Sequence, residues 1–126
     1  NHISSFYDFF ATACDIANIQ IPFSTDGISF YPTLIGKNQT QHEYLYWEYP
    51  SSGGLQAIRM GKWKGIKKNL FKTDSRLQLY DLSNDPMELI DVSKIFPDKI
   101  KLIEKYLDEA HSTPTVKKFI IPILEN

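Results

Sequence analysis

The stretch from residue 44 to residue 91 constrains the fold most, because runs of bulky side chains alternate there with turn-forming residues. Aromatic and aliphatic residues typical of half-buried strands gather in four runs, residues 44–49, 55–59, 62–67 and 77–82. Pro50 and Gly53-Gly54 interrupt the series, since proline lacks an N–H donor and glycine permits left-handed backbone. Met60-Gly61 has the length of a tight hairpin connection, and Asn84-Asp85-Pro86 forms a turn. The stretch predicts a four-stranded antiparallel sheet.

A helix is predicted before this stretch. Ser5 followed by Asp8 matches a capping box. Apolar residues then recur at helical spacing, at Phe6, Phe9, Phe10, Ala13 and Ala17. Asn18 is suited to close the helix in left-handed conformation. Cys14 lies beside the stripe with no neighbouring base or cation to activate it, so we interpret it as a structural thiol.

A second long helix follows the sheet. Pro97 suits its first position, and its expected buried stripe is Ile100, Ile103, Leu107 and Ala110. Residues 30–36 contain at most a short helix, with Pro32 in its first turn. We expect the second long helix to cover one face of the sheet. We also expect at least one of Trp47 and Trp63 to be deeply buried, and the apolar strip 119–124 to pack on the body or on a partner.

Composition excludes several classes of function. The chain has 126 residues, 42% of them apolar, which suffices for a core of ordinary size. Its net charge of −1 gives no strong field for nucleic acid or an anionic membrane. No apolar run reaches the 18 residues of a membrane-spanning helix. The start, which has no initiator Met and no signal-like segment, suggests a piece of a longer chain. The fold class is α+β.

No catalytic constellation is visible in the sequence. His2, His42 and His111 lack zinc-ligand spacing, and Walker A, G-x-S-x-G and dinucleotide motifs are absent. Asp26 in its Gly turn could ligate a metal, although a local cap is the commoner role. The aromatic residues of 44–49 could stack sugars or pack a sheet face. The basic residues of 59–72 could bind a polyanion or keep a sheet edge soluble.

Five segments in order resemble the carboxy-terminal part of a type I sulfatase, of the arylsulfatase and N-acetylhexosamine-6-sulfatase kind. They are HISS with DFFAT (residues 2–5 and 8–12), DGISFYPTLIG (26–36), YLYWE (44–48), QAIRMGKWK (56–64) and LYDLSNDPME (79–88). Each segment alone is weak, but all five in this order, over residues 2–111, are specific. Ala11 and Asn18 depart from the family, which usually has Pro and Gly there.

The resemblance implies a two-part organisation. Residues 1–40 would end the large α/β domain of an alkaline-phosphatase-like fold, and residues 41–126 would form the carboxy-terminal subdomain. Sulfatases of this family hydrolyse sulfate esters with a formylglycine made in a C/S-x-P-S-R motif and with a calcium ion. Cys14 is followed by Asp15-Ile16-Ala17, so the motif is not here, and both groups are expected in an amino-terminal domain. The parent enzyme is expected to be periplasmic or secreted, and to act on sulfated glycans.

The resemblance also suggests that loops of this part line the rim of the sulfate pocket. We name four candidate substrate-binding residues on that basis: His42, Trp47, Glu48 and Arg59. His42 and Glu48 could bond sugar hydroxyls, Trp47 could stack a ring, and Arg59 could pair with a sulfate or carboxylate. No catalytic or metal-binding residue is expected within the chain. The aromatic stripe of the first helix would pack on the amino-terminal domain, and without that domain we expect self-association or a non-native docking of residues 1–22.

Two other functions stay open from sequence. A free-standing carbohydrate-binding module would use Trp47, Trp63 and the tyrosines as a stacking platform. The tail of a related phosphodiesterase or phosphonate hydrolase would look similar.

Overall fold

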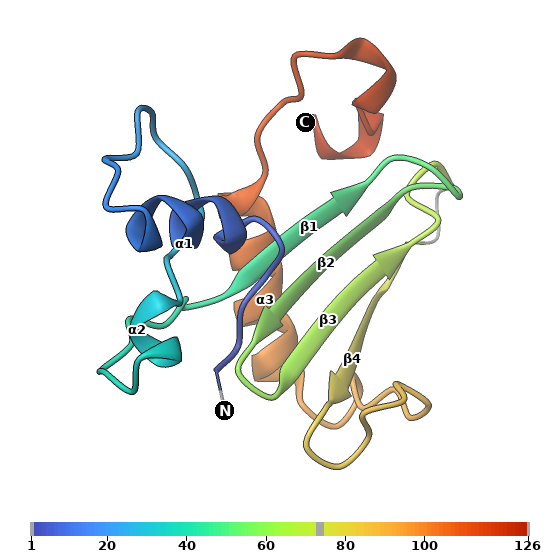
Figure 1. Ribbon diagram of the computed structural model, residues 1–126. Helices are drawn as coiled ribbons and strands as arrows, with labels where there is room; N and C mark the ends of the chain where they lie inside the picture. Colours follow the sequence, from blue (N-terminus) through green and yellow to red (C-terminus); the bar gives the residue numbers. More distant parts are fainter. Residues whose placement is uncertain (1, 73–74, 126) are drawn as a thin grey trace. The chain divides into compact units, whose positions relative to one another are not determined.

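A computed structural model of the protein describes residues 2–72 and 75–125. The chain forms two compact units, which divide between Leu45 and Tyr46 (Figure 1). The first unit contains helices α1 (Asp8–Ile16) and α2 (Tyr31–Leu34). The second contains the sheet and helix α3 (Pro97–Ala110), followed by 3₁₀ turns η1 (Lys117–Phe119) and η2 (Pro122–Leu124).

The predicted meander is confirmed. Its strands are β1 (Leu45–Tyr49), β2 (Leu55–Met60), β3 (Trp63–Lys68) and β4 (Leu77–Asp81), in the order β1-β2-β3-β4. Both β2 with β3 and β3 with β4 pair antiparallel. The tight connection is displaced by one residue from its predicted place, because Met60 still pairs with Trp63. Gly61, with a φ of 56°, is the first residue of the turn, where primed hairpin turns need positive φ.

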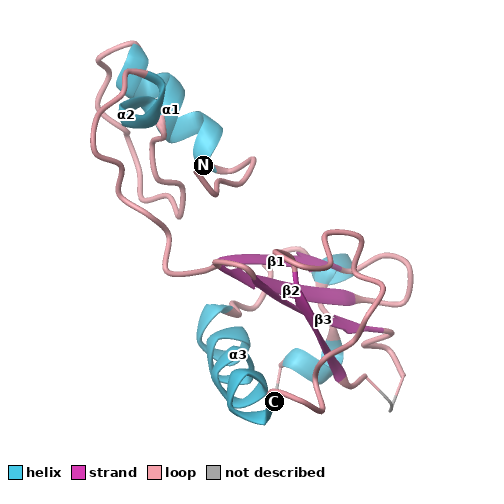
Figure 2. Ribbon diagram, turned by 90° about the horizontal axis from the view of Figure 1, so that it is seen from below, coloured by secondary structure: helices cyan, strands magenta, loops and turns pink. Residues whose placement is uncertain are grey.

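Helix α3 covers one face of the sheet, as predicted (Figure 2). Ile103 and Leu107 are fully buried, whereas Ile100 and Ala110 at the ends of the stripe are half-buried. Ile58, Gly65 and Leu79 stand opposite one another on neighbouring strands, and Ile58 and Leu79 are also fully buried. A Cβ at Gly65 would lie 2.7 Å from Cγ2 of Ile103. The glycine therefore permits the close approach of helix and sheet.

The expectation of a deeply buried tryptophan is wrong, because Trp47 and Trp63 are both half-buried. Aliphatic residues opposite α3 fill the core face. Trp47 lies instead among residues of the other sheet face. Trp63 lies at the start of β3, where its ring centroid is 4.9 Å from that of Phe96 and 4.8 Å from the Lys62 ammonium.

The carboxy-terminal strip packs on the second unit through one fully buried residue, Ile121. Ile123 and Leu124 line a cavity together with Leu107 of α3. Phe119 remains 44% exposed, so the strip is anchored at its centre and open at its start.

Helix α1 ends as predicted, but its aromatic stripe is not buried within the chain. Asn18 has a φ of 52°, and the Ile19 N–H donates to Cys14 O at 2.8 Å, which closes the helix end. Phe6 is 92% and Phe9 62% exposed. The opposite face is the buried one, and it carries Asp8, Ala11, Thr12 and Cys14. Polar groups on that face bond the following loop, and this holds it against the chain.

Helix α2 has Pro32 in its first turn, as expected. No helix within the described residues is long and apolar enough to cross a membrane.

Candidate functional site

The four predicted substrate-binding residues lie in three different places. Trp47 and Arg59 line one hollow on the sheet face that α3 leaves open. Glu48 lies on the α3 side, bonded to Tyr46 and His111. His42 belongs to the first unit, where it contacts Asp8. Within the second unit, the structure thus brings Trp47 and Arg59 together and places Glu48 on the other side of the sheet.

The hollow has a volume of about 550 Å³. Its floor comes from alternate residues of three strands, which share one sheet face because strand side chains alternate. Its rim comes from the segment after β4. The lining residues are Trp47, Ala57, Arg59, Lys64, Ile66, Leu82, Pro86 and Glu88. An indole beside a guanidinium and an ammonium can receive a ring that carries an anionic group.

The two cations of the hollow differ in their partners. The Lys64 ammonium lies 2.5 Å from Glu88 Oε1, and both side chains are about three-quarters buried. Glu88 adopts a φ of 57°, which is uncommon for a residue with a side chain. Arg59 Nε donates to Gly61 O at 3.2 Å, and within the described ranges no carboxylate forms an ion pair with it. Arg59 is therefore the cation available to an anionic ligand.

The turn after β4 is organised by Asp81. Its Oδ2 lies 2.8 Å from the Lys62 ammonium, and its Oδ1 accepts from the backbone N–H and the hydroxyl of Ser83. Lys62 and Ser83 lower the pKa of Asp81 to about 2. The QAIRMGKWK and LYDLSNDPME segments are thus joined by two ion pairs, Lys62–Asp81 and Lys64–Glu88. This gives a physical reason for their joint occurrence.

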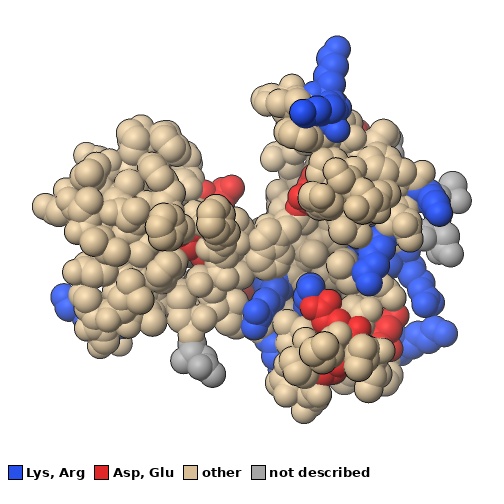
Figure 3. Space-filling view, turned by 45° about the vertical axis from the view of Figure 1, so that its right-hand side comes forward, with Lys and Arg blue, Asp and Glu red and all other residues tan. Residues whose placement is uncertain are grey.

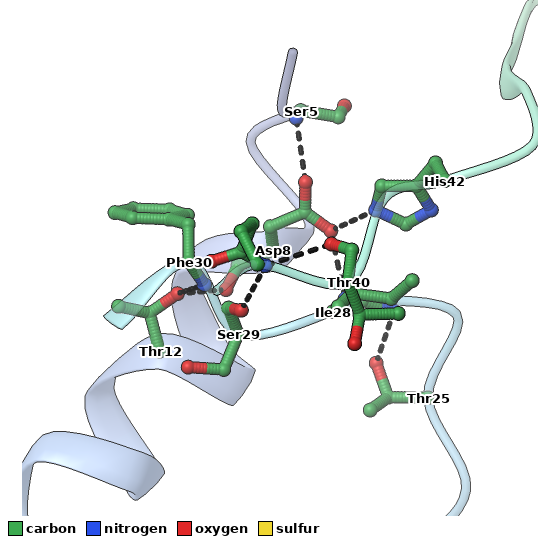
Figure 4. Close-up of polar contacts among 11 residues, drawn as sticks. Ser5, Asp8, Thr12, Thr25, Ile28, Ser29, Phe30, Thr40 and His42 are labelled. Atoms are coloured by element: carbon green, nitrogen blue, oxygen red, sulfur yellow. Dashed lines mark hydrogen bonds and ion pairs between the residues drawn. The ribbon is translucent and has the colours of Figure 1, made fainter. Parts of the chain in front are cut away.

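His42 belongs to a buried polar hub around Asp8 (Figure 4). Asp8 is fully buried, and its Oδ1 lies 2.7 Å from His42 Nε2 and accepts from the Ile28 N–H at 2.9 Å. Its Oδ2 accepts from the Ser5 N–H at 2.7 Å. Burial acts to raise the pKa of Asp8, but the N–H groups of Ser5 and Ile28, with His42, outweigh it and the pKa is lowered. The hub therefore holds an ionised carboxylate.

A second set of contacts joins the same helix to the same loop. The Thr12 hydroxyl donates to Asp8 O at 2.8 Å and accepts from the Phe30 N–H at 3.0 Å. A Cβ at Gly27 would lie 2.4 Å from Tyr7 O, so this close approach requires glycine. The local bond expected from Asp26 comes instead from Thr25, whose Oγ1 accepts from the Gly27 N–H at 3.2 Å. These contacts explain why DFFAT and DGISF occur together.

Glu48 takes part in a network on the α3 side of the sheet. The Tyr46 hydroxyl donates to Glu48 Oε1, which also lies 2.6 Å from His111 Nδ1. Gln56 Nε2 donates to the Tyr46 hydroxyl at 2.9 Å. Burial, opposed by Gln56 and reinforced by Glu48, raises the pKa of Tyr46 well above its ordinary value. The phenol therefore remains protonated and donates to Glu48.

The described residues do not fit the groups that the resemblance implies. No cluster of three or more His, Cys, Asp or Glu side chains in residues 2–72 and 75–125 could hold a metal ion. Cys14 is buried in α1, and its sequence context is not that of a formylglycine. No reaction step is therefore derived through calcium or formylglycine on this chain.

Known proteins share the fold and are similar to this chain in sequence. The sequence model described as "N-sulphoglucosamine sulphohydrolase, C-terminal" matches residues 2–112. A curated relative, the Delta 4,5-hexuronate-2-O-sulfatase of Bacteroides thetaiotaomicron, is 30% identical over 113 residues, which cover 79% of this chain and 23% of the relative. A solved structure of a 2-O GAG sulfatase aligns with a TM-score of 0.65 and 27% identity, over 82% of this chain and 24% of its own.

A phosphonate monoester hydrolase of Agrobacterium radiobacter also aligns, with a TM-score of 0.65 over 85% of this chain and 24% of its own. At 23% identity this likeness shows the fold alone. The chain spans about a quarter of the length of these relatives. The α+β fold of an alkaline-phosphatase-like enzyme's carboxy-terminal part is thus confirmed, and so is the resemblance to sulfatases. The five ordered segments, the sheet with its covering helix and the match over residues 2–112 agree: the chain belongs to the N-sulphoglucosamine sulphohydrolase C-terminal family.

Proposed function

We propose that this chain is the carboxy-terminal part of a sulfatase that hydrolyses sulfate esters on sulfated glycans. The family match over residues 2–112 carries the proposal, together with relatives about four times as long. The reacting groups, formylglycine and calcium, would belong to an amino-terminal domain of the same enzyme. Periplasmic location or secretion of that enzyme is part of the proposal, since its substrates would be extracellular glycans.

The hollow around Trp47 and Arg59 is our candidate for the contribution of this part to substrate binding. Arg59 has its guanidinium fork available, and that fork matches sulfate and carboxylate geometry. Trp47 offers an indole beside it for the face of a sugar ring. The residues that line the hollow do not include His42 or Glu48, whose role in substrate binding stays a prediction. His42 Nε2 and Glu48 Oε1 already contact Asp8 and His111, respectively, so a sugar hydroxyl would have to bond the other ring nitrogen or the other carboxylate oxygen.

The exposed face of α1 is the proposed surface for the amino-terminal domain. Phe6 and Phe9 stack with centroids 6.4 Å apart, and Phe10 and Phe23 stack at 5.3 Å. Phe6, Phe9 and Phe23 are each more than 60% exposed. Few charged side chains lie on the first unit in Figure 3, in contrast with the second unit. An exposed aromatic surface of this kind is typical of a contact with another domain.

The decisive experiment is an assay of the parent enzyme and of the 126-residue chain alone. The chain alone should not hydrolyse a chromogenic aryl sulfate, with or without calcium. The parent should do so and should also desulfate sulfated saccharides. A parent that hydrolyses phosphonate monoesters and no sulfate ester would identify the phosphonate hydrolase alternative. Calcium-dependent turnover by the chain alone would contradict the proposal.

Whether the hollow takes part in substrate binding is tested with a variant of the parent enzyme. Arg59→Ala should raise KM roughly tenfold, the size expected for one charge-assisted hydrogen bond to an anion. Lys68→Ala on the exposed end of the same hairpin is the matched control and should leave KM unchanged. Equal KM values for Arg59→Ala and the unmodified parent would remove Arg59 from the substrate site. Binding of sulfated sugars by the chain alone, with no activity in the parent, would favour a carbohydrate-binding module.

A further inference from the structure

His111 lies between two carboxylates that belong to distant parts of the second unit. Its Nδ1 is 2.6 Å from Glu48 Oε1 on β1 and within hydrogen-bond geometry. Its Nε2 has no hydrogen-bond partner among the described residues and lies 3.3 Å from Glu125 Oε1, an ion-pair distance only. The side chains of His111 and Glu48 are 13% and 17% exposed, so water screens their contact weakly. Glu125 is an exposed residue, although its side chain is 21% exposed. The Thr113 hydroxyl donates to the other oxygen of Glu125 at 2.5 Å.

A neutral imidazole cannot serve both carboxylates. It carries one N–H, so one of its nitrogens would present a lone pair to an ionised oxygen. The imidazolium carries two N–H groups and is attracted to both carboxylates. The arrangement of Glu48, His111 and Glu125 therefore suits the protonated state. Histidine is the side chain that changes charge between about pH 5 and pH 8.

We propose that residues 112–125 form a pH-dependent strap, which protonated His111 closes by linking Glu125 to Glu48. When His111 loses its proton, the Nε2 contact with Glu125 becomes unfavourable while the Nδ1 contact with Glu48 persists. The buried side chain of Ile121 then remains as the apolar anchor of the strap. Opening is therefore a shift in population from a closed to an open strap, not an unfolding of the unit.

The other charged and titratable groups around His111 do not replace it as the switch. Tyr46 on β1 stays protonated, because burial raises its pKa well above the ordinary value. Asp108 on α3 and Lys67 on β3 line the same cavity as His111 and are of opposite charge type. Gln56 on β2 is neutral, and its Nε2 is occupied by the Tyr46 hydroxyl.

The strap closes over a polar cavity of about 410 Å³. Ile123 and Leu124 of the strap line it together with Leu107 and Asp108 of α3. Gln56, 1% exposed, lines it too, and its Oε1 has no hydrogen-bond partner among the described residues. Opening the strap would therefore expose polar groups as well as Ile123 and Leu124. The cavity is the region whose accessibility this switch would control.

Limited proteolysis of the full chain tests the strap directly. Trypsin cleaves after Lys117 and Lys118, which are exposed in the strap sequence but lie in the 3₁₀ turn η1. The rate at these bonds, followed by mass spectrometry, is compared at pH 6 and pH 8. At each pH it is divided by the rate for a free peptide of residues 112–125. This removes the pH dependence of the protease.

The normalised rate should rise about fivefold to tenfold from pH 6 to pH 8, the size of one partly buried charge-assisted contact. His111→Gln and Glu125→Gln should each abolish the rise. Glu109→Gln, which alters an exposed α3 carboxylate paired with Lys105, should behave like the unmodified chain. If His111→Gln fails to fold, Glu125→Gln decides alone, since it changes only the strap. A flat profile in the unmodified chain, or a full rise in Glu125→Gln, would overturn the proposal.

Discussion

Replacement of Asp8 by Asn tests whether a buried carboxylate organises the first unit. Asp8 Oδ2 accepts from the Ser5 N–H, whereas Oδ1 serves both the Ile28 N–H and His42. The amide of Asn has the same shape but only one acceptor oxygen. In either orientation its NH₂ faces a backbone N–H that the carboxylate had satisfied. His42 can change tautomer to suit, but a backbone N–H cannot.

The expected loss follows from these contacts. An unsatisfied buried donor costs about 1–3 kcal/mol, and losing the charge-assisted character of the other bonds adds to this. We expect Asp8→Asn to lower the free energy of opening of the helix–loop contact by about 2–4 kcal/mol. That corresponds to roughly 30-fold or faster amide exchange in residues 25–30, since 1.4 kcal/mol is a factor of ten.

Hydrogen–deuterium exchange measured by mass spectrometry is the suitable assay, because Trp47 and Trp63 both lie outside the first unit and its unfolding has no tryptophan signal. Asp26→Asn is the matched control, since Asp26 is exposed in the same loop, and its exchange should equal that of the unmodified chain. If peptides of residues 25–30 in Asp8→Asn exchange within threefold of the unmodified rate, then Asp8 does not organise this unit.

The lowered pKa of Asp8 predicts that the stability of the helix–loop contact depends on pH. The pKa of Asp8 is lowered in the folded state, so the group favours folding above the ordinary carboxyl pKa of about 3.9. This contribution is lost as the pH falls through the lowered value. Protection of residues 25–30, corrected for intrinsic exchange, should therefore decline on acidification below about pH 4. Asp8→Asn should lack this decline, because the amide does not titrate.

Two further predictions concern packing. Gly65→Ala should lower the free energy of unfolding by about 1–3 kcal/mol, measured from the urea midpoint, because the new methyl meets Cγ2 of Ile103. The loss should shrink in an Ile103→Ala background, and equal losses in both backgrounds would show that the contact is not the cause. The isolated chain should self-associate through its exposed aromatic face, whereas a chain shortened to start at Ser24 or carrying Phe6→Ser and Phe9→Ser should associate less in light scattering. If all three are monomeric and bind an apolar reporter dye equally, the aromatic face drives no association.

The sequence predicts elements whose signals are local. Turn residues and bulky runs locate the four strands, and the spacing of Ile103 and Leu107 identifies the buried side of α3. The left-handed closure at Asn18 follows from residue type and position. The hairpin turn is misplaced by one residue because either Met60-Gly61 or Gly61-Lys62 satisfies the glycine requirement of a two-residue loop.

The candidate site depends on contacts that no local pattern reveals. Asp8 makes the local bond to the Ser5 N–H that a capping-box pattern predicts, yet its other partners Ile28 and His42 are 20 and 34 residues away. His111 and Glu48 are separated by 63 residues. Hydrophobic periodicity identifies the aromatic stripe with Phe6 and Phe9, which is exposed within this chain. It does not reveal the polar groups on the opposite face of α1 that hold the helix within this chain.

The Lys64–Glu88 ion pair has a consequence for how related sequences should vary. Loss of either residue leaves the other as a partly buried charge without its counterion, whereas exchange of both preserves the pair. Positions 64 and 88 should therefore change together in homologues. The two positions do not accept the same replacements, because residue 88 must adopt a positive φ, where Asn and Gly are favoured over longer side chains. We expect homologues that lose the acid at position 88 to carry Gly or Asn there, together with an uncharged residue at position 64.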